Sequence, residues 1–230
     1  MNDQQLQYFA YAEALNLVEK QIAHINSLKL PFKCKSVLEV GSGPLGKYTE
    51  FMIEQGGDVT CLDVRQDHLD ALNRKFSNLK TVVGDMNEEC IHGLYDIIFS
   101  AGNLYHLSKP AECIKHMAEH CTEFLLISSA VINGHQGIDY VTEPTNDSAQ
   151  AFNGTGCRPS REWIYAELKK YFKYVMIPRS QPNHMDFIID WTLGKVYNHA
   201  LRAIFIATNN APLDPTVWSE DLLTHQTKFL

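Results

Sequence analysis

Three glycines follow a short apolar stretch near the start of the chain, at Gly41, Gly43 and Gly46, with Ser42 between the first two. Glycines at the spacing G-x-G-x-x-G let backbone N–H groups and the start of the next helix approach a ligand closely. The same spacing also describes a nicotinamide-binding turn. What separates the two kinds of turn is Glu39, two residues before the first glycine, together with acidic residues further along the chain.

Two further carboxylates follow the next two apolar stretches. Asp63 ends the stretch 58–63, 20 residues after Gly43. It could accept hydrogen bonds from both hydroxyl groups of a ribose, because a carboxylate offers two oxygens. Asp85 ends the stretch that begins near residue 80 and precedes Met86. Single acidic residues at strand ends often only cap helices, but three after three successive strands, with the glycines, indicate a ligand site.

His106 is the candidate general base of this site. It follows the fourth predicted strand by a few residues, where the ligand crevice of such a sheet opens, and an imidazole can take up a proton near neutral pH. Two alternatives stay open: the histidine only forms a wall of the cofactor site, or it lies on the surface without a role.

Alternating strands and helices would position these side chains. We expect strands at 36–40, 58–63, 80–84, 95–100 and 123–130. Helical patterns lie at 5–28, 46–55, 66–76, 88–92 and 109–120, and a further helix within 158–171 would be capped by Ser160. This order predicts an α/β fold with a Rossmann-like, doubly wound, mostly parallel sheet. The strands 173–178 and 201–208 are joined by a loop, which predicts an antiparallel last strand.

Two long connections, 131–158 and 179–200, are predicted to bind a substrate, because long loops in compact domains are commonly functional. Both mix aromatic rings with amides and carboxylates, a composition that suits a sugar or another hydroxylated ring. The candidate substrate-binding residues are Tyr105, Asp139, Tyr140, Glu143, Arg158, Asn183, His184, Asp186 and Trp191. The competing interpretation makes Trp191 a core residue. Residues 184, 186 and 190 could instead bind a divalent cation, but a site without metal is preferred.

Composition bounds the class of protein. The 230 residues fit one domain with a substantial core, and 20 basic against 27 acidic residues give a net charge of −7. This balance argues against a protein held to nucleic acid by phosphate contacts. The six cysteines form no C-x-x-C pair, and no secretory leader or membrane-spanning run is visible. We therefore expect a cytoplasmic protein without nucleic-acid or membrane partners.

Over residues 30–208 the chain resembles the class I S-adenosylmethionine-dependent methyltransferases, on the strength of the glycine turn and the acidic strand ends. The resemblance implies S-adenosylmethionine as cofactor, with its amino-acid end on the glycine turn and Glu39 acting on its positive charge through space or water. It also implies that Asp85 accepts from the adenine amino group and that an apolar neighbour packs on the ring. The cofactor-binding residues are then Glu39, Gly41, Ser42, Gly43, Gly46, Asp63, Val64, Asp85, Met86 and Ser100.

The acceptor of the methyl group is less constrained. An O-methyltransferase acting on a hydroxyl of a sugar, a glycan or another small molecule is favoured, because an alcohol needs a base such as His106. One alternative is an N-methyltransferase acting on a small amine or a protein side chain, and another is a catalytically silent cofactor-binding protein. The segment Ser100–His106 lacks the Pro-Pro motif of enzymes that methylate base amino groups, and no Pro-Cys dipeptide for carbon methylation is present.

The last third resembles methyltransferases of polysaccharide and secondary-metabolite pathways, on the segments 158–163, 181–184 and 202–208. The expected organisation is a single methyltransferase domain over 1–230. Within it, residues 1–30 would form a helix that could act as a lid, and 209–230 an extended tail that could cross to a second subunit in a homodimer.

Overall fold

The structure is a computed structural model that describes residues 12–134, 136–147, 149–193, 195 and 197–230. Strands and helices alternate through its first half. In chain order these are α2 (Ala12–Ser27), β1 (Ser36–Val40), α3 (Lys47–Glu54), β2 (Asp58–Asp63), α4 (Gln66–Lys75), β3 (Lys80–Val83), β4 (Tyr95–Ala101), the 3₁₀ turn η1 (Leu104–His106), α5 (Pro110–Glu119) and β5 (Cys121–Val131).

The second half adds a hairpin and the far edge of the sheet. Its elements are β6 (Ile138–Thr142), β7 (Thr155–Pro159), α6 (Arg161–Leu168), β8 (Tyr174–Pro178), β9 (Ser180–Gln181), β10 (Leu201–Thr208), β11 (Trp218–Ser219) and β12 (Thr227–Lys228). Ser160 caps α6, as predicted, by accepting a hydrogen bond from the Trp163 N–H at 3.1 Å.

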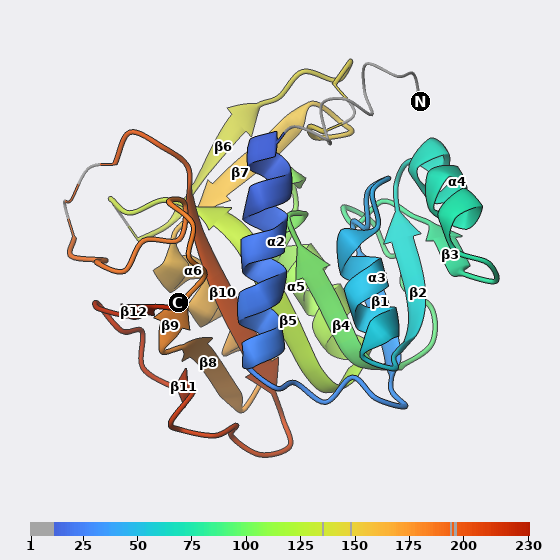
Figure 1. The fold of residues 1–230 in the computed structure, drawn as a ribbon. Coiled ribbons are helices and arrows are strands. Elements are labelled where there is room, and N and C mark those ends of the chain that lie inside the picture. The colour runs from blue at the N-terminus through green and yellow to red at the C-terminus, as the bar shows by residue number, and fades with distance from the viewer. Residues whose placement is uncertain (1–11, 135, 148, 194, 196) are drawn as a thin grey trace.

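One eight-stranded sheet organises the molecule, in the order β11-β8-β10-β5-β4-β1-β2-β3 (Figure 1). The strands β1 to β5 pair in parallel, while β10 runs antiparallel between β5 and β8. The predicted α/β fold, with a Rossmann-like doubly wound sheet and an antiparallel last strand, is confirmed. The carboxyl ends of β1, β2, β3 and β4 therefore meet along one edge, where the predicted site residues follow them.

The sheet is covered on both faces, which explains why its strands are continuous apolar runs. In β1, Val37 packs into the cluster on one face, whereas Leu38 and Val40 pack into the cluster on the other. Helix α2 crosses the face of the sheet in front of β5 and β10 (Figure 1). Among the described residues, no helix has the length and apolarity needed to cross a membrane.

Three predicted segments differ from what is observed. The predicted helix at 88–92 is wrong: Asp85 Oδ1 accepts from both the backbone and the side-chain nitrogen of Asn87, which turns the chain there. The loop 131–158 contains the β6–β7 hairpin, with Ile138 opposite Pro159. In the predicted helix 5–28, residues 5–11 lie outside the described residues, and α2 begins at Ala12.

The tail after β10 stays extended. Its short strands β11 and β12 pair with β8 and β9. The Lys228 ammonium group donates to the carbonyl oxygens of Pro182, at 3.1 Å, of His184, at 2.7 Å, and of Phe187. The tail thereby holds the start of the 179–200 segment against the domain.

Candidate active site

The glycine turn has the backbone conformation that only glycine adopts easily. Gly41 and Gly43 have φ angles of 71° and 60°, in the left-handed region. A Cβ atom on Gly41 would lie 2.7 Å from Asn103, so this glycine is needed for close packing between β1 and the segment after β4. A Cβ atom on Gly43 would meet no protein atom within 4 Å, and Gly43 lines a cavity. The turn is therefore open to a ligand at Gly43.

Asp63 is held directly beside this turn. Its Oδ2 accepts from the Gly43 N–H at 2.9 Å, and its Oδ1 accepts from the Arg65 N–H at 2.9 Å. The His68 imidazole lies 3.3 Å from Oδ1. A carboxylate has about four acceptor positions, so Asp63, which lines the cavity, retains capacity for ribose hydroxyls.

Asp85 and Met86 follow β3 and line the same cavity, as does Val64 after β2. Asp85 Oδ1 accepts both hydrogen bonds from Asn87, so the carboxylate retains acceptor capacity for a ligand in the cavity. Met86 is 3% exposed and supplies an apolar wall beside it. An acceptor oxygen next to an apolar surface is what the exocyclic amine and the face of an adenine ring require.

The cavity that joins these residues has a volume of about 460 Å³, a size that suits one nucleotide-like ligand. Ala14, Leu17, Val18 and Gln21 of α2 form one wall, so the predicted lid helix lies against the cavity along its described part. The side-chain nitrogen of Asn103, which also lines the cavity, is buried without a hydrogen-bond partner. The unpaired donor of Asn103, the open turn at Gly43 and the carboxylates of Asp63 and Asp85 together suit the polar groups of S-adenosylmethionine.

Two predicted cofactor residues lie beneath the cavity and do not line it. Glu39 is 2% exposed and accepts hydrogen bonds from the Thr49 hydroxyl and the Cys61 thiol. Burial raises the pKa of Glu39 to about 7, against the lowering effect of those two bonds, and Asp63 raises it further. Ser100 is fully buried in β4 opposite Val40, so direct contact of Ser100 with the cofactor does not fit its position.

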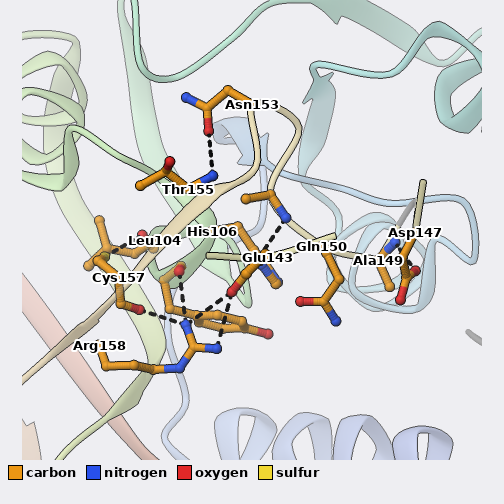
Figure 2. A network of polar contacts seen from close by, with 12 residues as sticks. Leu104, His106, Glu143, Asp147, Ala149, Gln150, Asn153, Thr155, Cys157 and Arg158 are labelled. Carbon is orange, nitrogen blue, oxygen red and sulfur yellow. Dashed lines mark hydrogen bonds and ion pairs between the residues drawn. The ribbon is translucent and has the colours of Figure 1, made fainter. Parts of the chain in front are cut away.

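His106 faces the cavity at the end of η1 and is held by Glu143 at the end of β6 (Figure 2). The Glu143 Oε2 atom lies 2.7 Å from His106 Nδ1 and also accepts from the Ala151 N–H at 2.7 Å. The Glu143 Oε1 atom accepts from both terminal nitrogens of Arg158 at 3.1 Å. Figure 2 shows Glu143 between His106 and Arg158.

The carboxylate of Glu143 is strongly held in its charged form. Burial alone would raise the pKa of Glu143, but the hydrogen bond and charge of His106 outweigh it, helped by the Ala151 N–H and Arg158, and lower the pKa to about 2. Both oxygens are engaged inside the protein and Glu143 lines neither cavity, so this carboxylate faces His106 and Arg158 and is not placed for the predicted contact with a substrate.

Tyr105 lies beside His106, with the two ring centres 4.1 Å apart, and lines the cavity. Two guanidinium groups approach its ring: Arg158 at 5.5 Å and Arg202 at 5.2 Å from the centroid. The structure thus brings together Tyr105, His106 and Arg158 of the predicted residues. Such an arrangement supplies a proton acceptor, a hydroxyl and positive charge around one end of the cavity.

The other predicted substrate residues are distributed less compactly. Asp139 lines a second cavity, of about 500 Å³, that shares Ala130, Arg158 and Ala200 with the first. Tyr140 and Asn183 are exposed and line neither cavity. Asp186 lies 3.9 Å from the His184 imidazole.

Trp191 is 5% exposed, and its indole N–H donates to Gln226 at 2.9 Å. The Arg161 guanidinium lies 4.1 Å from its ring. The prediction that Trp191 binds the acceptor does not fit this buried position, and the core interpretation does. Within the described parts of the chain, no group of three or more His, Cys, Asp or Glu side chains could hold a metal ion.

Gln21, Phe152 and Arg202 are among the cavity-lining side chains that sequence reasoning missed. The Phe152 ring lies 5.2 Å from the guanidinium carbon of Arg65, which also donates to the carbonyl oxygens of Asp147 and Gln150. The segment between β6 and β7 is therefore held over the cavity by a residue of the cofactor half. Arg202 could have been noticed as a lone cation at the start of an apolar strand.

Comparisons with known proteins agree with this geometry. Residues 37–123 match the family model of a methyltransferase domain. The N-terminal domain of EvdMO1, solved in the presence of SAH and D-fucose, has a TM-score of 0.64 and 14% identity over 84% of each chain. An S-adenosylmethionine-dependent methyltransferase from Clostridium acetobutylicum ATCC 824 has a TM-score of 0.59 and 14% identity over 91% of this chain and 100% of its own.

The sugar N-methyltransferase KedS8 from Streptoalloteichus sp ATCC 53650 is also similar, with a TM-score of 0.57 and 14% identity over 91% of this chain and 94% of its own. A search of curated protein sequences finds no significant match. At these identities the solved structures establish the fold, and the matched domain covers the glycine turn, Asp63 and Asp85. The matches therefore show a methyltransferase domain model over residues 37–123 and a fold shared with solved structures that include an S-adenosylmethionine-dependent methyltransferase and a domain with SAH bound.

Proposed function

We propose that this methyltransferase acts on a hydroxyl group of a sugar, a glycan or another small polyhydroxylated molecule, with His106 as general base. The observation that carries the proposal is the 2.7 Å contact between His106 Nδ1 and the buried Glu143 carboxylate, at the wall of the cofactor cavity. With Nδ1–H donating to Glu143, His106 Nε2 is the ring nitrogen that can accept a proton.

The chemistry follows from this pair. When bound, S-adenosylmethionine supplies a methyl group on a positively charged sulfur, which is already electrophilic. An alcohol is barely ionised at neutral pH, so removal of its proton as the oxygen forms the new bond to carbon is a useful contribution. His106 Nε2 takes that proton, and the Glu143 carboxylate balances the charge of the resulting imidazolium. Arg158 keeps Glu143 in place through both of its terminal nitrogens.

Two observations favour a sugar-like acceptor. The second cavity adjoins the first through Ala130, Arg158 and Ala200, and Asp139, Tyr197 and His199 also line it. A carboxylate, an imidazole and an aromatic ring suit hydroxyl groups and the apolar face of a sugar ring. Two of the similar structures also have names that mention sugars: one was solved with D-fucose, and one is a sugar N-methyltransferase.

N-methylation of an amino sugar is the second candidate, and the likeness to a sugar N-methyltransferase is the observation that favours it. An unprotonated amine is a good nucleophile without a base. The dependence of the reaction on His106 therefore separates the two candidates: loss of the imidazole is expected to reduce O-methylation far more than N-methylation at high pH.

The direct test is incubation with S-adenosylmethionine labelled in the methyl group and a panel of glycosides, amino sugars and simple amines. Label on a hydroxyl of a glycoside supports the proposal, and mass spectrometry locates the oxygen. Label only on nitrogen favours the second candidate. Tight cofactor binding without transfer to any compound of the panel or to protein would instead indicate a silent cofactor-binding protein.

A further inference from the structure

Arg202 is a buried cation with few hydrogen-bond partners. It lies at the start of β10, its side chain is 16% exposed, and it lines the cofactor cavity. Among the described residues, its guanidinium group makes one hydrogen bond, from Nη2 to the Tyr105 hydroxyl at 3.3 Å. Its Nε atom is buried without a hydrogen-bond partner. A guanidinium group has five N–H donors, so most of its capacity is unused.

The nearest carboxylate is shared and not well aligned. Asp186 Oδ2 lies 3.5 Å from Arg202 Nε without forming a hydrogen bond. The other oxygen of Asp186 lies within 3.9 Å of His184 and 3.8 Å of His199, and the Lys228 ammonium group also acts on this carboxylate. Burial of a charged group is unfavourable unless the group is paired and hydrogen-bonded. Asp186 is thus shared between Arg202, the Lys228 ammonium group and two imidazoles, which leaves Arg202 able to take a second anion.

A second unpaired donor lines the same cavity from another element of the fold. Gln21 on α2 is 2% exposed, lines the cavity, and its side-chain nitrogen has no hydrogen-bond partner. Helix α2 crosses the sheet in front of β10, so the two donors approach the cavity from two layers of the molecule (Figure 1). A buried donor without a partner is unfavourable, and one that lines a cavity can be satisfied by an acceptor on a ligand.

We infer that Arg202 and Gln21 form a carboxylate-binding site at the Tyr105 end of the cavity. A planar guanidinium group and an amide N–H₂ group match the two oxygens of a carboxylate. Two ligands of a methyltransferase could bring that group: the amino-acid end of the cofactor, or an acidic acceptor such as a uronic acid. The inference rests on the cavity and on the two unpaired donors, and it does not depend on whether oxygen or nitrogen is methylated.

The first arm of the test asks whether the cofactor supplies the carboxylate. Calorimetry compares S-adenosylmethionine with decarboxylated S-adenosylmethionine, which keeps both positive charges and lacks only the carboxylate. In Arg202→Gln, affinity for S-adenosylmethionine is expected to fall about 10- to 100-fold, while affinity for the decarboxylated compound stays the same or improves. This difference between the two ligands would place the cofactor carboxylate at Arg202.

The second arm asks whether the acceptor supplies it. The protein is saturated with S-adenosylhomocysteine, and binding of glucuronate and of glucose is compared by saturation-transfer NMR. If S-adenosylmethionine affinity is unchanged in Arg202→Gln but the glucuronate signal is lost and the glucose signal remains, the site serves an acidic acceptor. If neither the cofactor nor glucuronate depends on Arg202 in a folded variant, the inference is overturned.

Two further variants test whether a loss of binding comes from misfolding and not from the loss of a contact with the ligand. Arg161 is a buried arginine that does not line the cavity and stacks on Trp191, so Arg161→Gln should lower stability without changing the ratio of the two cofactor affinities. Gln21→Leu removes the second unpaired donor without leaving a polar group behind. Gln21→Leu should weaken binding of the same carboxylate ligand a few-fold. The site would also be refuted if Gln21→Leu, Arg202→Lys and Arg202→Gln all left the affinity for that ligand unchanged.

Discussion

Glu143 and His106 are 37 residues apart in the chain, and their side chains meet at 2.7 Å between Glu143 Oε2 and His106 Nδ1. Glu143 directly follows β6 of the hairpin, and His106 ends the 3₁₀ turn after β4. The contact therefore joins the segment that shapes the acceptor side to the strand end beside the cofactor. This pairing fixes which imidazole nitrogen faces the cavity.

Replacement of His106 tests the base directly. In His106→Ala, turnover of a hydroxyl acceptor should fall about 10²- to 10⁴-fold, because the proton acceptor is lost, while S-adenosylhomocysteine affinity changes little. Turnover is measured with labelled cofactor and affinity by calorimetry. His225→Ala is a suitable control, because the His225 side chain is 71% exposed and lines neither cavity. Full activity of His106→Ala would refute the role.

Replacement of Glu143 tests its positioning role. Glu143→Gln removes the charge that stabilises protonated His106, so turnover should fall about 10²-fold and the acidic limb of the pH–rate profile should move to lower pH. A purely structural role would lower stability without moving that limb. Glu89→Gln is the matched control, because the exposed Glu89 carboxylate also lies near an imidazole, that of His116 at 3.6 Å, but outside the cavity.

Glu39 predicts a pH-dependent stability. Its folded-state pKa, raised to about 7 by burial, means that the folded protein holds a proton that the unfolded chain releases near pH 4.5. The contribution of Glu39 to the free energy of unfolding is therefore fully present below pH 4.5. It is lost as the pH rises through 7, and the loss amounts to about 3 kcal/mol. Glu39→Gln stays neutral, so it should unfold at higher denaturant than the wild type at pH 8.

At pH 8 the same variant should bind S-adenosylmethionine more weakly, because the negative charge of Glu39 beneath the cavity is lost. Urea unfolding at pH 5 and pH 8 gives the comparison, and the advantage of Glu39→Gln should shrink at pH 5. Glu54→Gln, on the exposed part of α3, should show no such dependence. An equal effect of Glu39→Gln at both pH values would contradict the prediction.

Gly41 is expected to be intolerant of a side chain. Gly41→Ala places an alanine at a φ angle of 71° and puts its Cβ atom 2.7 Å from Asn103, so both strain and overlap lower stability, by about 2 kcal/mol or more. Gly93→Ala separates the two costs, because Gly93 has a φ angle of 81° and no atom within 4 Å of the added Cβ. Equal losses in the two variants would show that Asn103 moves aside at no cost.

The main sheet could be predicted from the sequence because its strands are short apolar runs between polar or glycine-rich segments. The bounds of β1, β2 and β10 agree with the predicted 36–40, 58–63 and 201–208. The acidic residues and glycines at the strand ends could also be found, since their chemistry and spacing are local features. These features define the cofactor half of the cavity.

The acceptor half could not be predicted in the same way, because its contacts join distant segments. Strand β7 contains Gly156 and Pro159, which disfavour strand formation, and it forms only because β6 pairs with it. The polar residues next to Trp191 in the sequence led to the prediction that its ring binds a ligand. Its partners Gln226 and Arg161 lie far away in the chain, and only the folded structure shows that they enclose it.

The β6–β7 hairpin forms a separate two-stranded sheet, joined to the end of β5 by the isolated bridge between Ile132 and Ser160. Homologous or designed hairpins could therefore be exchanged as one unit without altering the register of the main sheet. Any such exchange must carry a carboxylate at position 143 for His106 and backbone carbonyl groups at positions 147 and 150 for Arg65. Those three positions set the minimal rules for engineering a new acceptor preference on this scaffold.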